Sequence, residues 1–126
     1  MKKRILAMAF LALSGSVWAQ ADADFPTRPI KLIAPYAPGG SADVLARTLA
    51  SYLSAELKQS VVVENKPGAN TMIAASAVAR SPADGYTLLL ASNASMVLNP
   101  LLYKKLSYNP DKELKLINIL AEAPLV

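Results

Sequence analysis

The chain has 126 residues, enough for one small domain or for part of a larger one. It contains no cysteine and no histidine, which excludes disulfides, cysteine nucleophiles and histidine bases or metal ligands. The formal charge is +4, but three of the 13 basic residues lie at the N-terminus. The other ten, against nine acidic residues, leave +1, which disfavours nucleic acid and membrane surfaces as partners.

Residues 1–19 have the pattern of a secretory signal peptide. Basic residues at 2–4 precede an apolar run at 5–13, and small residues follow that run. The run is shorter than the roughly 20 apolar residues that span a bilayer. Cleavage after Ala19 fits best, with Ala21 as the second choice. The pattern predicts an exported protein, and a buried N-terminal helix is the alternative.

The region after the signal peptide predicts alternating strands and helices. Residues 20–29 are polar and Pro-rich and are expected to form an N-terminal arm. The run "IKLIA" at 30–34 lies between two prolines, which predicts a first strand. Ser41 can cap a helix that continues to about Lys58 and that buries one apolar face. The residues expected on that face are Val44, Leu45, Leu49, Tyr52, Leu53 and Leu57, with Arg47, Ser51, Ser54 and Lys58 mostly on the opposite side.

The same alternation continues along the chain. The β-branched run at 60–65 predicts a second strand, and the Ala-rich segment 71–80 predicts a helix that packs closely on a sheet. A turn at 81–86 leads into a near-continuous apolar run at 86–92, as in a strand covered on both faces. A short helix at 98–105 and a fourth strand at 115–121 complete the predicted elements.

This order of elements predicts βαβ crossovers and a parallel sheet, so the fold class is α/β. Ligands of such sheets bind at the carboxyl ends of the strands. Three loops follow strands here, at 35–43, 65–70 and 92–96. All three should therefore lie along one edge of the sheet.

The first loop places Gly39 and Gly40 directly before a helix, where free backbone N–H groups and the helix dipole favour an anion. The dipole contributes only about 0.3–1 kcal/mol, so several donors must converge on the ligand. Asp43 would oppose a carboxylate in direct contact. We expect Asp43 to order the loop or a water instead. An ordinary tight turn with a capping aspartate is the alternative interpretation.

The second loop repeats this design, with a glycine turn and polar residues at the start of the next helix. Ser92 and Asn93 add side-chain donors after the third strand. Sequence patterns of catalytic serines, phosphate loops and dinucleotide-binding turns are missing. The sequence therefore disfavours an enzyme, and we expect no cofactor and no metal.

Three long stretches carry a family resemblance: "RPIKLIAPYAPGGSADVLARTLA", "VVVENKPGANTMIAASAVARSPADGYTLLLAS" and "NPLLYKKLSYNPDKEL". Together they resemble the extracytoplasmic, Bug-type binding proteins of tripartite tricarboxylate transporters, from about Phe25 to Val126. The resemblance implies a periplasmic receptor with the type II periplasmic-binding-protein fold. Such a receptor captures a small carboxylate and delivers it to membrane permease subunits.

The resemblance also implies a ligand site, because the first two strand-to-helix loops of the family grip one carboxylate of the ligand through backbone groups and ordered waters. One departure concerns the second loop, where Asn70, Thr71 and Ala74 stand at positions that are usually glycine in the family. The ligand-binding residues carried over to this chain are Tyr36, Pro38, Gly39, Gly40, Ser41, Asp43, Gly68, Ala69, Asn70, Thr71, Ser92 and Asn93.

Family members are about twice this length or more, so residues 30–126 are expected to form only part of lobe 1, without lobe 2. The sequence thus predicts a truncated copy that is poorly stable and binds weakly. A small exported structural or interaction domain is the alternative function. Dimerisation would cover its exposed sheet, and a sizing column would distinguish the two.

Overall fold

The structure is a computed structural model that describes residues 25–122. The predicted signal peptide at 1–19 and the first part of the predicted arm lie outside the described residues. The described elements follow in the order β1 (Ile30–Ala34), α1 (Ser41–Leu57), β2 (Val61–Asn65), η1 (Ala69–Thr71), α2 (Met72–Ala79), β3 (Thr87–Leu89), η2 (Ala94–Leu98), α3 (Asn99–Leu102) and α4 (Pro110–Glu113).

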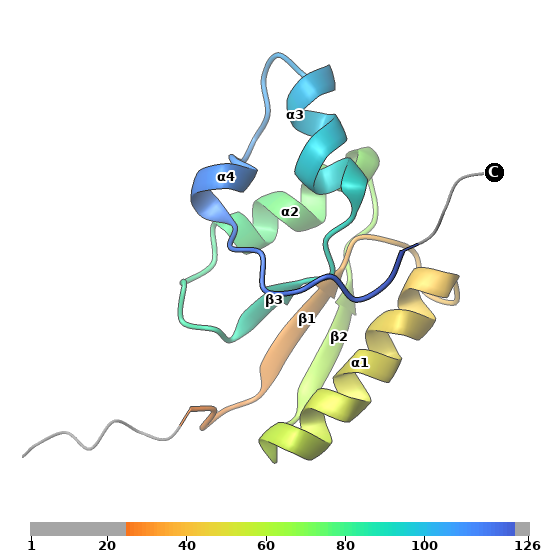
Figure 1. The fold of residues 1–126 in the computed structure, drawn as a ribbon, viewed down its shortest axis with the longest axis vertical. Helices are drawn as coiled ribbons and strands as arrows, with labels where there is room; N and C mark the ends of the chain where they lie inside the picture. Colours follow the sequence, from red (N-terminus) through yellow and green to blue (C-terminus); the bar gives the residue numbers. More distant parts are fainter. Residues whose placement is uncertain (1–24, 123–126) are drawn as a thin grey trace, which may run out of the picture.

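The strands form one parallel sheet in the order β2-β1-β3, with β1 in the centre (Figure 1). Ile30 is level with Val61 on β2, and Leu32 is level with Leu88 on β3. The chain passes from β1 to β2 on one side of it and then crosses back over β1 to β3 on the other side. Right-handed crossovers in these two directions place α1 and α2 on opposite faces of the sheet. The predicted parallel α/β arrangement is confirmed.

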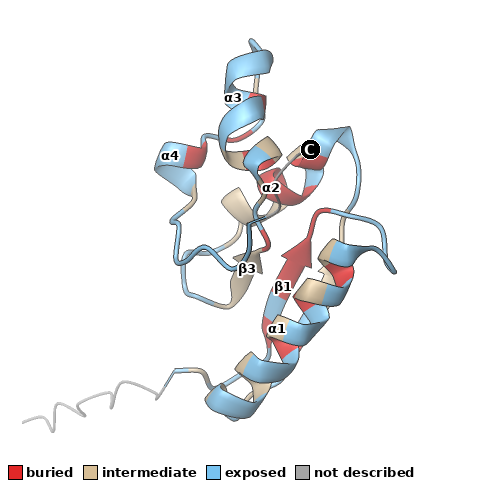
Figure 2. Cartoon of the chain, turned by 45° about the vertical axis from the view of Figure 1, so that its right-hand side comes forward, coloured by how far each residue is buried: buried red, intermediate tan, exposed pale blue. Residues whose placement is uncertain are grey.

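The strand β1 is the centre of the core and is almost entirely buried (Figure 2). Its side chains alternate between the two faces. Ile30, Leu32 and Ala34 belong to the cluster that contains Ala46 and Ala50 of α1. Ile33 projects to the other face and is 3% exposed. Burial on both faces explains why this stretch is continuously apolar apart from Lys31.

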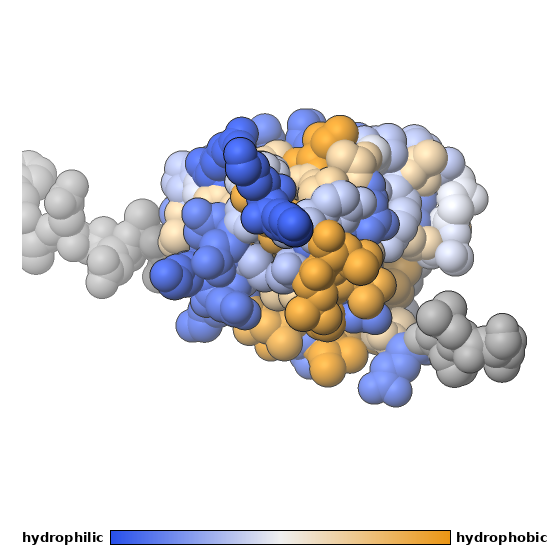
Figure 3. Space-filling model, turned by 90° about the horizontal axis from the view of Figure 1, so that it is seen from above, coloured by the Kyte–Doolittle hydropathy of each residue, from blue (hydrophilic) through white to orange (hydrophobic). Residues whose placement is uncertain are grey.

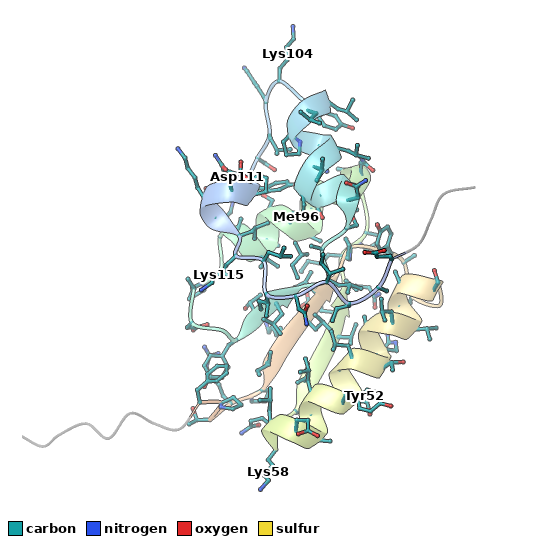
Figure 4. The ribbon with its side chains drawn as sticks, in the orientation of Figure 1. Tyr52, Lys58, Met96, Lys104, Asp111 and Lys115 are labelled. Carbon is teal, nitrogen blue, oxygen red and sulfur yellow. The ribbon has the colours of Figure 1, made fainter. Side chains whose placement is uncertain are left out.

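The face that α1 presents to the sheet agrees in part with the one expected, because four of the six expected residues pack against the core: Leu45, Leu49, Leu53 and Leu57. Ala46 and Ala50 are buried, with Leu45 and Leu49 partly buried beside them. The outer side of the helix carries Val44, Tyr52 and Arg47, so two of the expected core residues are exposed. Figure 4 shows the Tyr52 side chain directed away from the strands. Small alanines let the helix lie close to β1, and the line of closest contact runs through them, which leaves Val44 and Tyr52 outside the buried face.

The predicted fourth strand at 115–121 is wrong, because the described residues of this segment form no strand. Figure 1 shows the segment as an extended loop without a paired neighbour. Apolar character alone cannot make a strand, which also needs the edge of another strand for its hydrogen bonds. The third strand is likewise shorter than predicted. Four large apolar residues of the segment are exposed as a result: Leu116, Ile117, Ile119 and Leu120.

The remaining elements lie beyond the carboxyl end of the sheet. The short helix expected at 98–105 is found as α3, and it continues directly from the π-helix η2. The helix α4 was not predicted; Asn109 caps it by accepting hydrogen bonds from the amides of Asp111 and Lys112. Seen from above, this end of the molecule carries apolar side chains among polar ones (Figure 3). The exposed apolar residues of η2 and α3 are Val97, Leu98, Leu101 and Leu102.

At the opposite end of the sheet, the described part of the N-terminal arm packs on Tyr86. The Phe25 ring meets the Tyr86 ring edge-on with 4.9 Å between centroids. The Arg28 guanidinium lies 3.9 Å from the centre of the same ring and forms an ion pair with Asp84. Within residues 25–122, none of the helices has the length and hydrophobicity needed to cross a bilayer.

Candidate carboxylate site

The three loops expected to form the site all leave the sheet at the same edge. They follow Ala34 of β1, Asn65 of β2 and Leu89 of β3, and both strand pairings are parallel. Lys58, which follows the far end of α1, lies at the opposite end of the molecule from Met96 and Lys104 (Figure 4). The N-terminal ends of α1 and α2, which we call the helix heads, therefore lie at this edge of the sheet together with the loop before η2. We call this edge the rim.

Asp43 orders the first loop from within. Its Oδ2 accepts hydrogen bonds from the Gly39 N–H at 3.0 Å and from Arg47 Nε at 2.9 Å, and its Oδ1 accepts one from Asn65 Nδ2 at 2.9 Å. The residue is 4% exposed. The bond from the Arg47 guanidinium, followed by those from the Gly39 amide and Asn65, lowers the pKa of the Asp43 carboxyl to about 2.

The predicted ordering role of Asp43 is consistent with this geometry, but two details of the first loop differ from the prediction. The Gly39 amide is occupied by Asp43, so it is not free to meet a ligand. Ser41 does not cap α1, because Gly40 is the N-cap and no side-chain cap bond forms. Since the first amides of a helix have no partner inside the helix, the exposed head of α1 retains donors that face solvent.

Acid should weaken the fold through Asp43. The pKa of this carboxyl falls from 3.8 to about 2 on folding, so folding favours its ionised form. The resulting stabilisation is complete above about pH 4 and disappears as the pH falls toward about 2. We expect the thermal midpoint of the parent chain to exceed that of Asp43→Asn at pH 6, with a gap that closes between pH 4 and pH 2. A gap that stays constant over this range would contradict the role given to the carboxylate.

The second loop is left-handed over several residues. Gly68 has φ +119°, and Ala69, Asn70 and Thr71 have φ of 45°, 49° and 72°. The chain then returns to right-handed geometry at Met72, the first residue of α2. Successive residues of opposite handedness turn their N–H groups toward one concave side, a geometry that suits anions. The turn thus combines this concavity with the positive end of a helix dipole.

Side chains that the sequence did not single out connect the loops. Asn65, the last residue of β2, donates to the Tyr36 carbonyl at 3.0 Å as well as to Asp43. Asn99 of α3 exchanges two hydrogen bonds with Asn70. Asn65 could have been selected for its place at a strand end. The signal for Asn99 was weaker, because an asparagine before proline is usual at a turn or helix start.

Two serines of the third loop form hydrogen bonds with each other. The Ser92 amide donates to Ser95 Oγ at 2.9 Å, and Ser95 Oγ donates to the Ser92 carbonyl at 2.9 Å. Asn93 is exposed and precedes the π-helix η2, a type of helix that often occurs at functional sites. Ser92 is half-buried, so this loop offers the site fewer free groups than expected.

The predicted site residues therefore divide by exposure. Asp43 and Thr71 are buried, and Ser92 is half-buried. Thr71 Oγ1 is buried without a hydrogen-bond partner among the described residues. The other nine are exposed at the rim: Tyr36, Pro38, Gly39, Gly40, Ser41, Gly68, Ala69, Asn70 and Asn93.

A hollow lies elsewhere, between α3 and α4. Its volume is about 480 Å³, and Tyr103, Tyr108 and Asp111 are among its lining residues. None of the predicted site residues lines it. The part of the chain that the structure describes also holds no group of three or more acidic side chains suited to a metal ion.

Comparisons with known proteins agree with the fold. A model of the tripartite tricarboxylate transporter family receptors matches residues 45–126. The protein BugT of Bordetella pertussis is 42% identical over 127 residues, which cover 98% of this chain and 39% of BugT. The chain spans 31 to 39% of the length of the curated relatives that it matches.

Solved structures give the same result. A protein of R. palustris with adipate is 42% identical, with a TM-score of 0.66 over 70% of this chain and 29% of that protein. MatC of Rhodopseudomonas palustris with bound malate is 35% identical, with a TM-score of 0.67 over 71% of this chain and 30% of MatC. The predicted fold class, an α/β fold like that of periplasmic binding proteins, is confirmed.

Proposed function

Because the chain belongs to the family of tripartite tricarboxylate transporter receptors, we propose that it captures a small carboxylate for such a transporter. The proposal places the chain in the periplasm, exported through residues 1–19, with the membrane permease subunits as its partners. Adipate and malate, named in two related structures, are both dicarboxylates. A dicarboxylate is therefore the first ligand to test.

The single observation that supports this function most is the common edge of the two helix heads. The helices α1 and α2 both begin just after parallel, adjacent strands, so the positive ends of their dipoles lie on the same rim. One carboxylate can accept from backbone amides of both loops. Several such donors are needed, since each dipole alone contributes about 0.3–1 kcal/mol.

The charge of the rim is compatible with an anion. Asp43 is the acidic residue in the first turn of α1, and Arg47 holds it in an ion pair of 2.9 Å. The Arg47 side chain is 55% exposed, and its Nη2 also donates to Asn65 Oδ1 at 3.3 Å, so the guanidinium stays near the helix head. Asp43 is thus neutralised locally and can organise the Gly39 turn without repelling the ligand strongly.

Calorimetric titration of the chain with malate, adipate and the neutral diamide of adipic acid tests the function. We expect saturable binding of the two acids, with a Kd on the order of 1 mM, since only a few exposed donors converge on the ligand. The diamide has the length of adipate but no charge and should not bind. Equal binding of acid and diamide, or no binding of either acid, would overturn the proposal.

A pair of charge variants locates the site on the rim. Ser41→Asp adds a carboxylate at the exposed head of α1, where it competes with the ligand, and should raise the Kd for malate by at least about fivefold. Ser51→Asp adds the same charge at an exposed position further along the helix and should leave the Kd within about twofold. An acidic residue in the first turn stabilises a helix, so weaker binding by Ser41→Asp would not come from unfolding.

A further inference from the structure

Asn99 is a buried amide outside the set of expected ligand-binding residues. It is 0% exposed and is the first residue of α3. Its Nδ2 donates to the Asn70 carbonyl oxygen at 2.7 Å, and its Oδ1 accepts from Asn70 Nδ2 at 2.6 Å. The two residues are 29 positions apart in the chain. A reciprocal pair of short bonds thus joins α3 to the second loop of the rim.

The asparagine is not needed to start a helix. The π-helix η2 continues into α3, and Leu98, the residue before Asn99, already has helical φ of −72° and ψ of −44°. A capping side chain satisfies free amides where a helix begins, but here the helix began several residues earlier. The polar groups of Asn99 are therefore available for the loop.

The loop that Asn99 contacts does not adopt its conformation by preference. Ala69, Asn70 and Thr71 all have positive φ, which L-residues with a side chain avoid, and the β-branched Thr71 is the least suited. The Thr71 hydroxyl forms no hydrogen bond with the described residues, so it does not offset this strain. A contact from outside the loop is therefore needed to stabilise this conformation, and Asn70 lies in the middle of the loop.

Asn99 is itself held firmly. The Tyr108 hydroxyl donates to the Ser95 carbonyl oxygen and lies 3.4 Å from Asn99 Nδ2. Tyr108 is 4% exposed and Ser95 is 0% exposed. The amide is thus packed in a buried polar cluster that fixes its orientation.

We propose that Asn99 is a positioning residue of the carboxylate site, which clasps Asn70 and so holds the second loop in the left-handed conformation that an anion meets. The ligand part of this inference rests on the proposed function. The clasp itself is a property of the free chain and can be tested without any ligand.

The ligand-free test compares two substitutions at residue 70. Asn70→Ala removes the side-chain bond to Asn99 Oδ1, leaves the bond from Asn99 Nδ2 to the backbone carbonyl of residue 70, and keeps a Cβ, so the left-handed conformation loses half of its clasp and keeps its strain. We expect its thermal midpoint to fall by about 4–8 °C. Asn70→Gly removes the same amide but tolerates positive φ and should stay within about 2 °C of the parent chain. Equal midpoints of the two variants would show that residue 70 carries no left-handed strain for Asn99 to hold, which would overturn the proposed role of the clasp, and this comparison does not depend on Asn99→Ala folding.

The ligand test adds Asn99→Ala in two backgrounds. In the parent chain it should raise the Kd for malate by at least about fivefold, because the loop then samples other conformations. In the Asn70→Gly background the same change should alter the Kd by less than about twofold, because glycine reaches the loop conformation without the clasp. Equal losses in both backgrounds, or no loss in either, would show that Asn99 does not position the loop.

The two tests separate the possible failures. If the parent chain binds neither malate nor adipate, the proposed function is wrong, and the midpoints of the residue-70 variants still decide whether the loop carries the strain that the clasp is proposed to hold. If the parent chain binds malate and Asn99→Ala binds it equally well, the positioning role is wrong and the proposed function stands.

Discussion

Replacing Leu32 by alanine should lower the free energy of unfolding by about 2–5 kcal/mol. Leu32 is 2% exposed in the middle of the central strand and packs in the cluster that includes Ala46 and Ala50 of α1. The substitution removes buried methyl groups and leaves a cavity that the parallel sheet cannot close. Urea denaturation followed by circular dichroism measures the loss, which would be a large part of the stability of a domain this size.

Val62→Ala is the matched control for the core. Val62 lies on the neighbouring strand β2 but is 52% exposed, so its truncation should cost about 0.5 kcal/mol or less. If both substitutions had the same effect, the burial of β1 between two helices would be wrong, and with it the frame that carries the three loops.

Replacing Gly68 by alanine should destabilise the fold by about 1–3 kcal/mol and weaken malate binding as well. Gly68 has φ +119° and ψ 162°, a region that is essentially restricted to glycine. A Cβ at this position would also lie 2.8 Å from Ile73 Cδ1. The Ile73 side chain is half exposed and can move, so the backbone conformation accounts for most of the cost.

Gly40→Ala tests whether this effect belongs to the left-handed turn. Gly40 is the N-cap of α1 and has an ordinary φ of −82°, and a Cβ there would meet only the Ala37 carbonyl oxygen at 3.9 Å. The same chemical change should therefore cost less than about 1 kcal/mol, since alanine is only a poorer cap. A cost for Gly40→Ala equal to that for Gly68→Ala would contradict the special conformation of the second loop.

The parts of the fold that sequence reasoning predicted well have sharp local signals. The first strand has the predicted bounds because two prolines enclose a short apolar run. The helix α1 begins one residue earlier than expected, at Ser41, the residue predicted to cap it, and it ends within one residue of the expected position. The parallel order follows from the alternation of strands and helices, which leaves few topologies open.

The parts that sequence reasoning missed depend on distant contacts. Periodicity placed Val44 and Tyr52 in the core, but the sheet packs against the smaller residues Ala46 and Ala50. The apolar segment 115–121 has the composition of a strand and lacks a partner edge among the described residues. In both cases the local pattern is present, but contacts with distant residues decide which face of the helix is buried and whether the apolar segment forms a strand.

The sequence predicted the backbone turns of the candidate site better than the side-chain contacts that connect them. Glycine turns at the heads of helices identified both loops, and the charge of Asp43 indicated an ordering role. Arg47, four residues further along the helix, could have been recognised as the partner of Asp43 from its spacing. The clasp between Asn70 and Asn99 joins residues far apart in the sequence, and no local pattern marks it.

Whether the three loops share one carboxylate can be decided by titrating the isotopically labelled chain with malate and following each backbone amide by NMR. The amides at 40–42, 69–73 and 92–94 should shift together with a single Kd, while those at 56–62, at the far end of α1, stay unchanged. Shifts confined to residues 100–113, which line the hollow between α3 and α4, would show that the anion binds elsewhere and would contradict the proposed site.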